Sequence, residues 1–284
     1  MTEISRINLK EPLLYDADLS QDSCGVGFIT HKQSKQTHEL LVKAHEALCT
    51  IPHRGGMSAE GIGDGAGVNV DLSLRFFRKI TGNSNLQLGE FGVANFFFPE
   101  DHERYDNFAI ELIEKHLTRF GLPVITWRNI PVDSQVINEA SRKAQLPIKQ
   151  VIFGRPEALK TATHDEFEQL IQSALLDIEA DGFTRDELTG FYPLSMSSRT
   201  QVYKGRLNSF EVIPYFIDLY DEDHEIHTLF FHTRFSTNTA PATMMAQPFR
   251  YMAHNGELNT DKKNRLSENA IARLHNKHIV FPCG

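Results

Sequence analysis

The sequence predicts an α+β fold with layered sheets. Its strand patterns come in runs that a few long helices interrupt, whereas a doubly wound parallel sheet would need strict alternation of strand and helix. Two amphipathic segments, near residues 106–120 and 165–180, each carry a continuous apolar face of the kind that packs on a sheet. Turn residues separate the strands, but no linker divides the chain, so these elements are expected to form one domain.

The chain enters this domain through a strand, a helix and a loop. Residues 24–29 are small or apolar and predict a strand. Leucine and alanine then recur at helical spacing from 38 to 50, and Pro52 follows the end of this helix. Glycine dominates residues 55–67, which predicts a loop.

The remaining elements mix two long helices with several strands. The helix at 106–120 ends at Gly121, and the chain returns in a strand at 123–132. Thr163 is the expected N-cap of the helix at 165–180. Runs rich in β-branched and aromatic residues, bounded by turns, predict further strands at 68–72, 89–98, 191–197, 200–204, 210–219 and 228–233.

Composition excludes several classes of function. The 284 residues carry a formal net charge of -8 and no long run of lysine or arginine, so no nucleic-acid partner is expected. No apolar run reaches the length of a membrane span, and the first residues lack the pattern of a secretory signal. The three cysteines, Cys24, Cys49 and Cys283, are too scattered for a disulfide framework or a metal site, which favours a reducing cytoplasm.

Two short motifs carry the first candidate functional groups. Cys24 stands before Gly25 and Gly27, so its thiol would lie at a strand start with little steric hindrance; a buried, inert cysteine is the alternative. Arg54, between a helix end and a glycine loop, can hold a carboxylate through two parallel hydrogen bonds. The glycine loop itself lacks the lysine and the following helix of a phosphate loop, so a tight turn is expected.

The densest group of polar motifs lies near the end of the chain. His232–Thr239, Ala246–Arg250 and Ala253–Thr260 follow one another closely. Within the last of these, Asn255 and Gly256 can present a side-chain amide and an unobstructed backbone N–H together, as an oxyanion hole requires. An Asn-Gly pair taken alone is first of all a turn.

Together these motifs resemble one family. The chain is similar to the class II glutamine amidotransferase domain of glutamate synthase large chains, from Cys24 to about Thr260. Each motif is weak singly, but their shared order is specific. The matching motifs are CGVGF at 24, HRGG at 53, GDGAG at 63, SSRT at 197, YKG at 203, RFSTNT at 234, AQPFR at 246 and AHNGELNT at 253. This resemblance implies a four-layer αββα sandwich of the N-terminal nucleophile hydrolase type.

The resemblance also implies a mechanism. Cys24 would become the first residue once a leader, residues 1–23, is removed, and its own α-amine would act as general base; a flexible tail is the alternative for these residues. Asn255 and Gly256 match the oxyanion donors, and Arg54 and Arg234 match the groups around the glutamine carboxylate. His254 is expected to be structural, and no metal is expected.

The chain departs from the family pattern in two places. Ala240–Met245 replaces a segment that usually contains Trp-Pro. The family's domain also continues beyond this length, through an acid that binds the substrate α-amine, so we expect 24–284 to be an incomplete amidotransferase domain. The ammonia would serve reductive amination of 2-oxoglutarate in a glutamate synthase domain or subunit. FMN and an iron–sulfur cluster would belong to that synthase part, and no cofactor is expected here.

Two other functions remain open at this point. The domain could serve a different class II amidotransferase, since no acceptor domain is present in the sequence. It could also be a non-catalytic regulatory remnant, although the retention of Cys24, Arg54, Asn255 and Gly256 argues against this. Ammonia release from glutamine distinguishes these alternatives.

Overall fold

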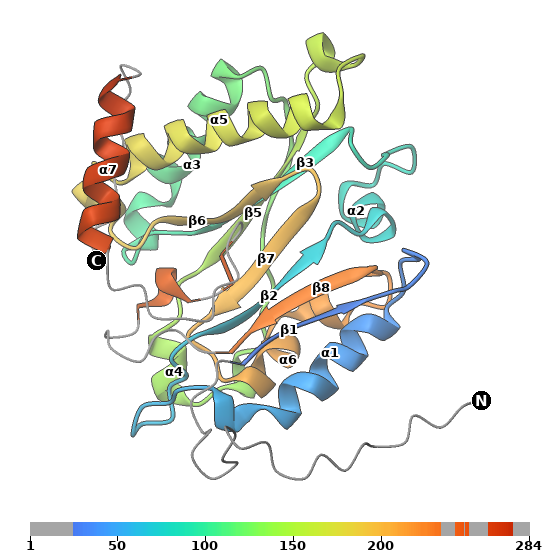
Figure 1. Cartoon of the computed structure of the whole chain (residues 1–284), viewed down its shortest axis with the longest axis vertical. Coiled ribbons are helices and arrows are strands. Elements are labelled where there is room, and N and C mark those ends of the chain that lie inside the picture. Colours follow the sequence, from blue (N-terminus) through green and yellow to red (C-terminus); the bar gives the residue numbers. More distant parts are fainter. Residues whose placement is uncertain (1–24, 234–241, 247, 250–260, 275–284) are drawn as a thin grey trace, which may run out of the picture.

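The computed structural model describes residues 25–233, 242–246, 248–249 and 261–274 (Figure 1). Within these ranges the strands are β1 (Val26–Thr30), β2 (Ala66–Asp71), β3 (Phe91–Phe97), β4 (Val124–Asn129), β5 (Ile148–Gly154), β6 (Tyr192–Ser197), β7 (Thr200–Gly205) and β8 (Thr228–His232). They form two four-stranded sheets, with the order β1-β8-β2-β7 in the first sheet and β4-β5-β3-β6 in the second. Every pairing is antiparallel, which confirms the α+β class.

Helices pack against both sheets. They are α1 (Glu39–Thr50), α2 (Leu74–Thr81), α3 (His102–Arg119), α4 (Glu139–Lys143), α5 (His164–Gly182), α6 (Val212–Tyr215) and α7 (Asp261–Leu274). In Figure 1, α3 and α5 lie over the second sheet, whereas α1 and α6 lie against the first. None of the helices in the described ranges combines the length and the apolar content that a membrane span requires.

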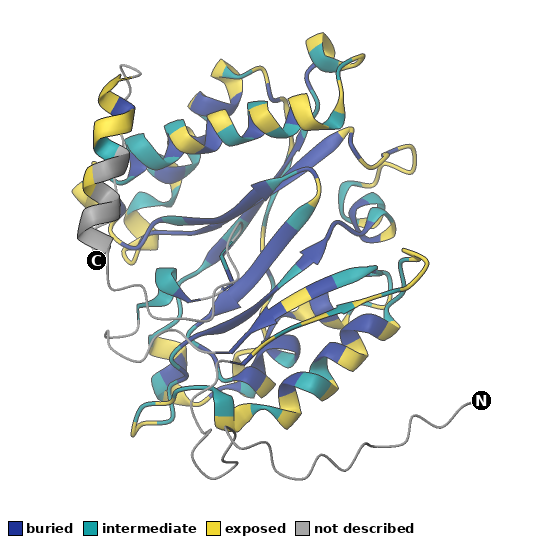
Figure 2. Ribbon diagram, in the orientation of Figure 1, coloured by how far each residue is buried: buried dark blue, intermediate teal, exposed yellow. Residues whose placement is uncertain are grey.

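The core is concentrated in the strands, as Figure 2 shows. Every residue of β3 is buried, because one face of this strand packs on α3 and α5 and the other faces the first sheet. Burial on both faces is consistent with its nearly continuous apolar sequence, Phe91–Phe97. β3 therefore lies between the helices α3 and α5 on one side and the first sheet on the other.

A buried polar network joins the two sheets. The Asn95 side chain donates to the Val202 carbonyl (3.0 Å), and Gln150 donates to Asn95 (2.7 Å). Arg128 in turn donates to Gln150 (2.7 Å) and makes a two-pronged ion pair with Asp218. Since buried polar groups are stable only when hydrogen-bonded, these contacts favour one relative placement of the sheets.

Most of the predicted elements are confirmed. The helices at 38–50, 106–120 and 165–180 correspond to α1, α3 and α5, with ends shifted by a few residues. The predicted cap is also confirmed, because the Thr163 side chain accepts a hydrogen bond from Glu166 N while Glu166 reaches back to Thr163 N. This capping box satisfies backbone donors that the first turn of α5 would otherwise leave unpaired.

The strand predicted at 210–219 is wrong. These residues form a short 3-10 turn, α6 and a second 3-10 turn. Asn208 and Glu211 form a capping box that starts the helical turns, and Pro214 has no N–H to donate to a strand ladder. A short apolar run is compatible with either a strand or a buried helical segment, so the apolar pattern of 210–219 could not predict which of the two forms. The elements α2, α4, β5 and α7 were not predicted.

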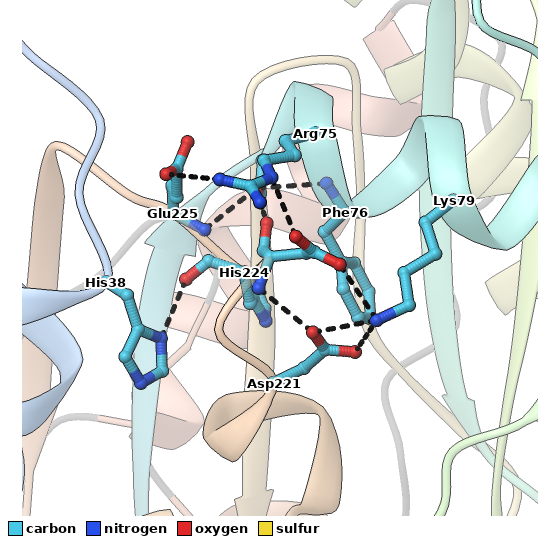
Figure 3. A network of polar contacts seen from close by, with 9 residues as sticks. His38, Arg75, Phe76, Lys79, Asp221, His224 and Glu225 are labelled. Atoms are coloured by element: carbon cyan, nitrogen blue, oxygen red, sulfur yellow. Dashed lines mark hydrogen bonds and ion pairs between the residues drawn. The ribbon is translucent and has the colours of Figure 1, made fainter.

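His224 anchors the loop between α6 and β8. Figure 3 shows this loop between α2 and His38. Arg75 forms an ion pair with Asp223 of the loop, and Lys79 pairs with both Asp221 and Asp223. The His224 ring is fully buried and stacks on Phe76 with 4.5 Å between ring centroids. Its Nδ1 donates to the Asp218 carbonyl (2.9 Å). Burial lowers the pKa of His224, and the hydrogen bond to Asp218 opposes this only in part.

This burial predicts a loss of stability in mild acid. In the unfolded chain the imidazole takes up a proton below about pH 6.5, whereas in the fold it stays neutral to lower pH. The contribution of the neutral His224 ring to the free energy of unfolding is therefore complete above pH 6.5. It declines as the pH falls towards the folded pKa, with a slope of up to about 1.4 kcal/mol per pH unit. The melting temperature, measured from pH 7 to 5, should depend less on pH in His224→Phe than in the wild type. The exposed-residue control His102→Gln should keep the wild-type slope; equal slopes for all three proteins would contradict the assignment.

Candidate active site

One end of the first sheet gathers the sequence motifs singled out above. β1 begins there and β8 ends there, with Val26 opposite His232. β2 begins at the same end, with Gly67 opposite both His232 and Lys204 of β7. The register therefore places the CGVGF, GDGAG and YKG motifs side by side, together with the residue that precedes Arg234.

Three of these motifs meet at Gly25. Thr233 N donates to the Gly25 carbonyl (2.8 Å), which extends the pairing of β1 and β8 beyond the strands. A Cβ added at Gly25 would overlap the Thr233 hydroxyl and would lie 3.1 Å from Cβ of Arg54. A Cβ at Gly55 would lie 3.0 Å from the Thr233 carbonyl oxygen. The Thr233 and Arg54 side chains therefore leave no room for a Cβ at Gly25, and the Thr233 carbonyl leaves little room for one at Gly55.

The predicted site residues fall into two groups. Arg54 ends a 3-10 turn, Pro52–Arg54, that follows α1, and its side chain is half-buried. Cys24, Arg234, Asn255 and Gly256 lie outside the described residues. However, Cys24 is the chain neighbour of Gly25 and Arg234 that of Thr233, the two residues whose backbones bond beside Arg54. The described contacts thus join Gly25, Thr233 and Arg54, and the placement of the four other predicted site residues stays a prediction.

The glycine loop after Arg54 is a compact hairpin. Met57 and Gly63 form an antiparallel bridge, and Asp64 N donates to the Gly56 carbonyl (2.9 Å). Four amides of the loop donate within it, those of Ser58, Gly61, Ile62 and Asp64. These amides are occupied, which agrees with the predicted tight turn and not with a phosphate cradle. The Asp64 carboxylate packs on Gly56, so an acid lies close to the HRGG motif.

Two asparagines fix this hairpin to the rest of the domain. The Asn208 side chain donates to the Gly61 carbonyl (3.3 Å), and that of Asn138 donates to the Glu60 carbonyl (3.2 Å). Gly63 lies directly on the Leu207 backbone, where a Cβ would overlap it. The hairpin that follows Arg54 is therefore held at several points.

No three His, Cys, Asp or Glu side chains within the described ranges are grouped so that they could hold a metal ion. Cys49 is free and exposed on α1, with its Sγ 3.7 Å from Nε2 of His45 one turn earlier. The described part of this region therefore consists of close contacts between chain segments around Arg54.

Comparisons with known proteins identify the family. The model of the class-II glutamine amidotransferases matches residues 24–280. The chain is 33% identical over 265 residues to "Glutamate synthase [NADH]" of Saccharomyces cerevisiae, which covers 89% of this chain and 12% of the yeast protein. It is 36% identical over 256 residues to "Glutamate synthase [NADPH] large chain" of Bacillus subtilis, and this match covers 88% of this chain and 16% of the Bacillus protein.

A third relative is the "Ferredoxin-dependent glutamate synthase" of Antithamnion sp., 34% identical over 255 residues, with 84% of this chain and 16% of the relative covered. The chain thus spans 12 to 16% of the length of these curated relatives. The matched region includes every motif at the sheet end and begins at Cys24 itself. This chain belongs to the class-II glutamine amidotransferases and is an amidotransferase domain of the glutamate synthase type.

Proposed function

We propose that this domain hydrolyses L-glutamine to glutamate and ammonia, with Cys24 as nucleophile. The observation that carries this proposal is the contact of Gly25, Thr233 and Arg54 at one end of the first sheet. It sets the chain neighbours of the proposed nucleophile and of Arg234 beside Cβ of Arg54, a half-buried residue. The family match supports the same reaction.

The general base is proposed to be the α-amine of Cys24. An α-amine titrates near pH 7.7 to 8 and can therefore accept a proton at neutral pH. This role requires removal of residues 1–23 as a leader, a proposal supported by the start of the family match at residue 24. The two antiparallel sheets, with helices packed against both, are consistent with the four-layer αββα sandwich of N-terminal nucleophile hydrolases.

The proposed chemistry has two stages. The amine takes the thiol proton, and the thiolate attacks the side-chain amide carbon of glutamine to form a tetrahedral oxyanion. The Asn255 side-chain NH₂ and the Gly256 N–H would donate to this oxyanion. Collapse of the intermediate breaks the C–N bond, the amine returns the proton to the leaving group, and ammonia departs. Water then hydrolyses the γ-glutamyl thioester to glutamate and restores Cys24.

Arg54 and Arg234 are proposed to bind the α-carboxylate of glutamine. Replacing Arg54 with lysine should raise KM about tenfold, because an ammonium cannot reproduce the two parallel hydrogen bonds of a guanidinium. The value of kcat should fall much less, since the carboxylate is remote from the reacting amide. Steady-state kinetics with glutamine measures both; a fall in kcat with an unchanged KM would assign Arg54 a different role.

The ammonia is proposed to serve a glutamate synthase domain or subunit that aminates 2-oxoglutarate. This follows from the names of the relatives, which are glutamate synthases with NADH, NADPH or ferredoxin in their descriptions. FMN and an iron–sulfur cluster would belong to that synthase part, and this domain would use no cofactor of its own. The shared family and motif order favour this destination over other class II amidotransferases.

The test is ammonia release from glutamine by the purified chain. Glutamate and ammonia should appear in equal amounts, and asparagine, whose amide lies one methylene closer to the carboxylate, should be a poor substrate. Intact mass should show a chain that begins at Cys24. Absence of turnover in the mature protein would remove the glutaminase proposal and favour a regulatory remnant.

A further inference from the structure

We propose that Lys204 is a positioning residue that holds the described residues of the 243–249 segment (243–246, 248 and 249) against the first sheet and so sets the start of the segment that leads to Asn255 and Gly256. Lys204 lies near the end of β7, and its side chain is fully buried. Lysine is rarely buried completely unless its ammonium is compensated, so this side chain needs a specific explanation. The proposed glutaminase mechanism assigns it no role.

The Lys204 ammonium contacts the 243–249 segment at two points. Its Nζ donates to the Met244 carbonyl (3.2 Å), and it lies 4.7 Å from the centroid of the Phe249 ring. On the other side it lies 5.0 Å from the ring of Tyr192 on β6. A carbonyl oxygen and two ring faces are the groups that attract a buried cation. The ammonium therefore connects the two sheets to both ends of the segment.

Other contacts hold the same segment from further sides. Thr243 Oγ1 donates to the Ala144 carbonyl (2.9 Å), at the end of α4. Ala246 is buried against Gly65 of the GDGAG motif, where an added Cβ would lie only 2.8 Å from Cβ of Ala246. Within the segment, Met245 N donates to the Ala242 carbonyl (3.0 Å). The 3-10 turn Thr243–Met245 and Ala246 are therefore held from several sides, and Lys204 supplies a charged contact.

The position of this turn matters for the reaction. Phe249 precedes Asn255 by six residues, so the turn is the last described point before the proposed oxyanion donors. Donors of this kind act only when they are held at the place where negative charge develops. Lys204 would act through this placement and would touch no reacting atom. The expected effect of Lys204 on catalysis rests on the proposed glutaminase activity. Its anchoring of the segment does not depend on that activity.

Hydrogen–deuterium exchange of the whole chain tests the anchoring without any substrate. Lys204→Met keeps most of the side-chain length but removes the charge, so amides of the 243–249 peptide should exchange at least about tenfold faster than in wild type. Val70→Ala is the matched control, because it opens the same core at the opposite end of the sheet. It should leave this peptide protected. Unchanged exchange in Lys204→Met would overturn the proposal.

Kinetics tests the consequence for the reaction. Lys204→Met should lower kcat about 10- to 100-fold and change KM less than about threefold, with the pH profile keeping its shape. Lys204→Arg, which retains a cation able to lie on the rings, should recover part of the loss. Alkylation of Cys24 by iodoacetamide should proceed at the wild-type rate, since the nucleophile and its base are untouched.

The outcomes separate this inference from the proposed function. Faster exchange with an unchanged kcat would overturn the positioning role while glutaminase activity stands. A changed pH profile would overturn it in favour of direct proton transfer. If the wild-type chain releases no ammonia, the proposed function fails, whereas the exchange result still decides whether Lys204 anchors the segment.

Discussion

Cys24→Ser is expected to lower glutamine turnover by at least about 1,000-fold. A cysteine thiol is far more acidic than a serine hydroxyl and forms a more nucleophilic anion, so the same amine base would leave serine a much weaker nucleophile at this position. The substitution is nearly isosteric and precedes Gly25, whose close contacts with Thr233 and Arg54 it leaves in place. Glutamine binding should therefore persist while turnover is lost, and ammonia release together with glutamine binding by calorimetry measures the two separately.

The matched control is Cys49→Ser. Cys49 is exposed on α1 and is free, so the same chemical change there should leave kcat and KM near the wild-type values. Equal losses in both variants would indicate that the substitution acts through folding. Retention of more than about a tenth of wild-type turnover by Cys24→Ser would exclude Cys24 as the nucleophile.

Asn255→Ala is expected to have the second-largest effect. Removal of one oxyanion donor lowers kcat by about 10² to 10³, because the hydrogen bond forms fully only with the charged intermediate. KM should change little, since the ground-state carbonyl gains less from the same donor. The loss should appear in single-turnover formation of the thioester as well as in steady-state turnover.

The contrast with Arg54→Lys makes this prediction specific. Asn255→Ala should act on kcat, whereas Arg54→Lys should act on KM. The same pattern in both variants would mean that the roles of the oxyanion donor and the carboxylate-binding group are wrongly assigned. Asn255→Asp is a further check, because a carboxylate cannot donate and would repel the developing negative charge.

Local sequence patterns predicted the long elements because their packing agrees with their periodicity. Helix α5 has both a capping box and an apolar face, and both are observed. The strand prediction for 210–219 is wrong because this segment is apolar almost throughout and has no clear helical periodicity. The capping box at Asn208 and the missing N–H of Pro214 favour the helical turns that are observed. The pairing of the strands depends on contacts between distant parts of the chain, such as β1 with β8, which no local pattern specifies.

Local sequence also indicated part of the geometry around Gly25, whereas the predicted roles of the site residues stay predictions. The glycines of the CGVGF and HRGG motifs mark positions where backbones meet, and Gly25 and Gly55 do contact Thr233 in this way. The sequence also indicated Arg54 as a carboxylate-binding group, and the structure places it beside Gly25. Lys204 could not be identified as an anchor, because its partners Met244 and Phe249 lie 40 residues or more along the chain.

The most direct test of the account is to trap the covalent intermediate. The purified chain is mixed with glutamine, quenched in acid within one turnover and digested, and the mass of each cysteine peptide is measured. The account predicts one added γ-glutamyl group on a peptide that begins with Cys24, and no addition to the peptide of Cys49. Turnover without any adduct, or an adduct on a peptide that still carries residues 1–23, would contradict a mechanism in which the α-amine of Cys24 activates its own thiol.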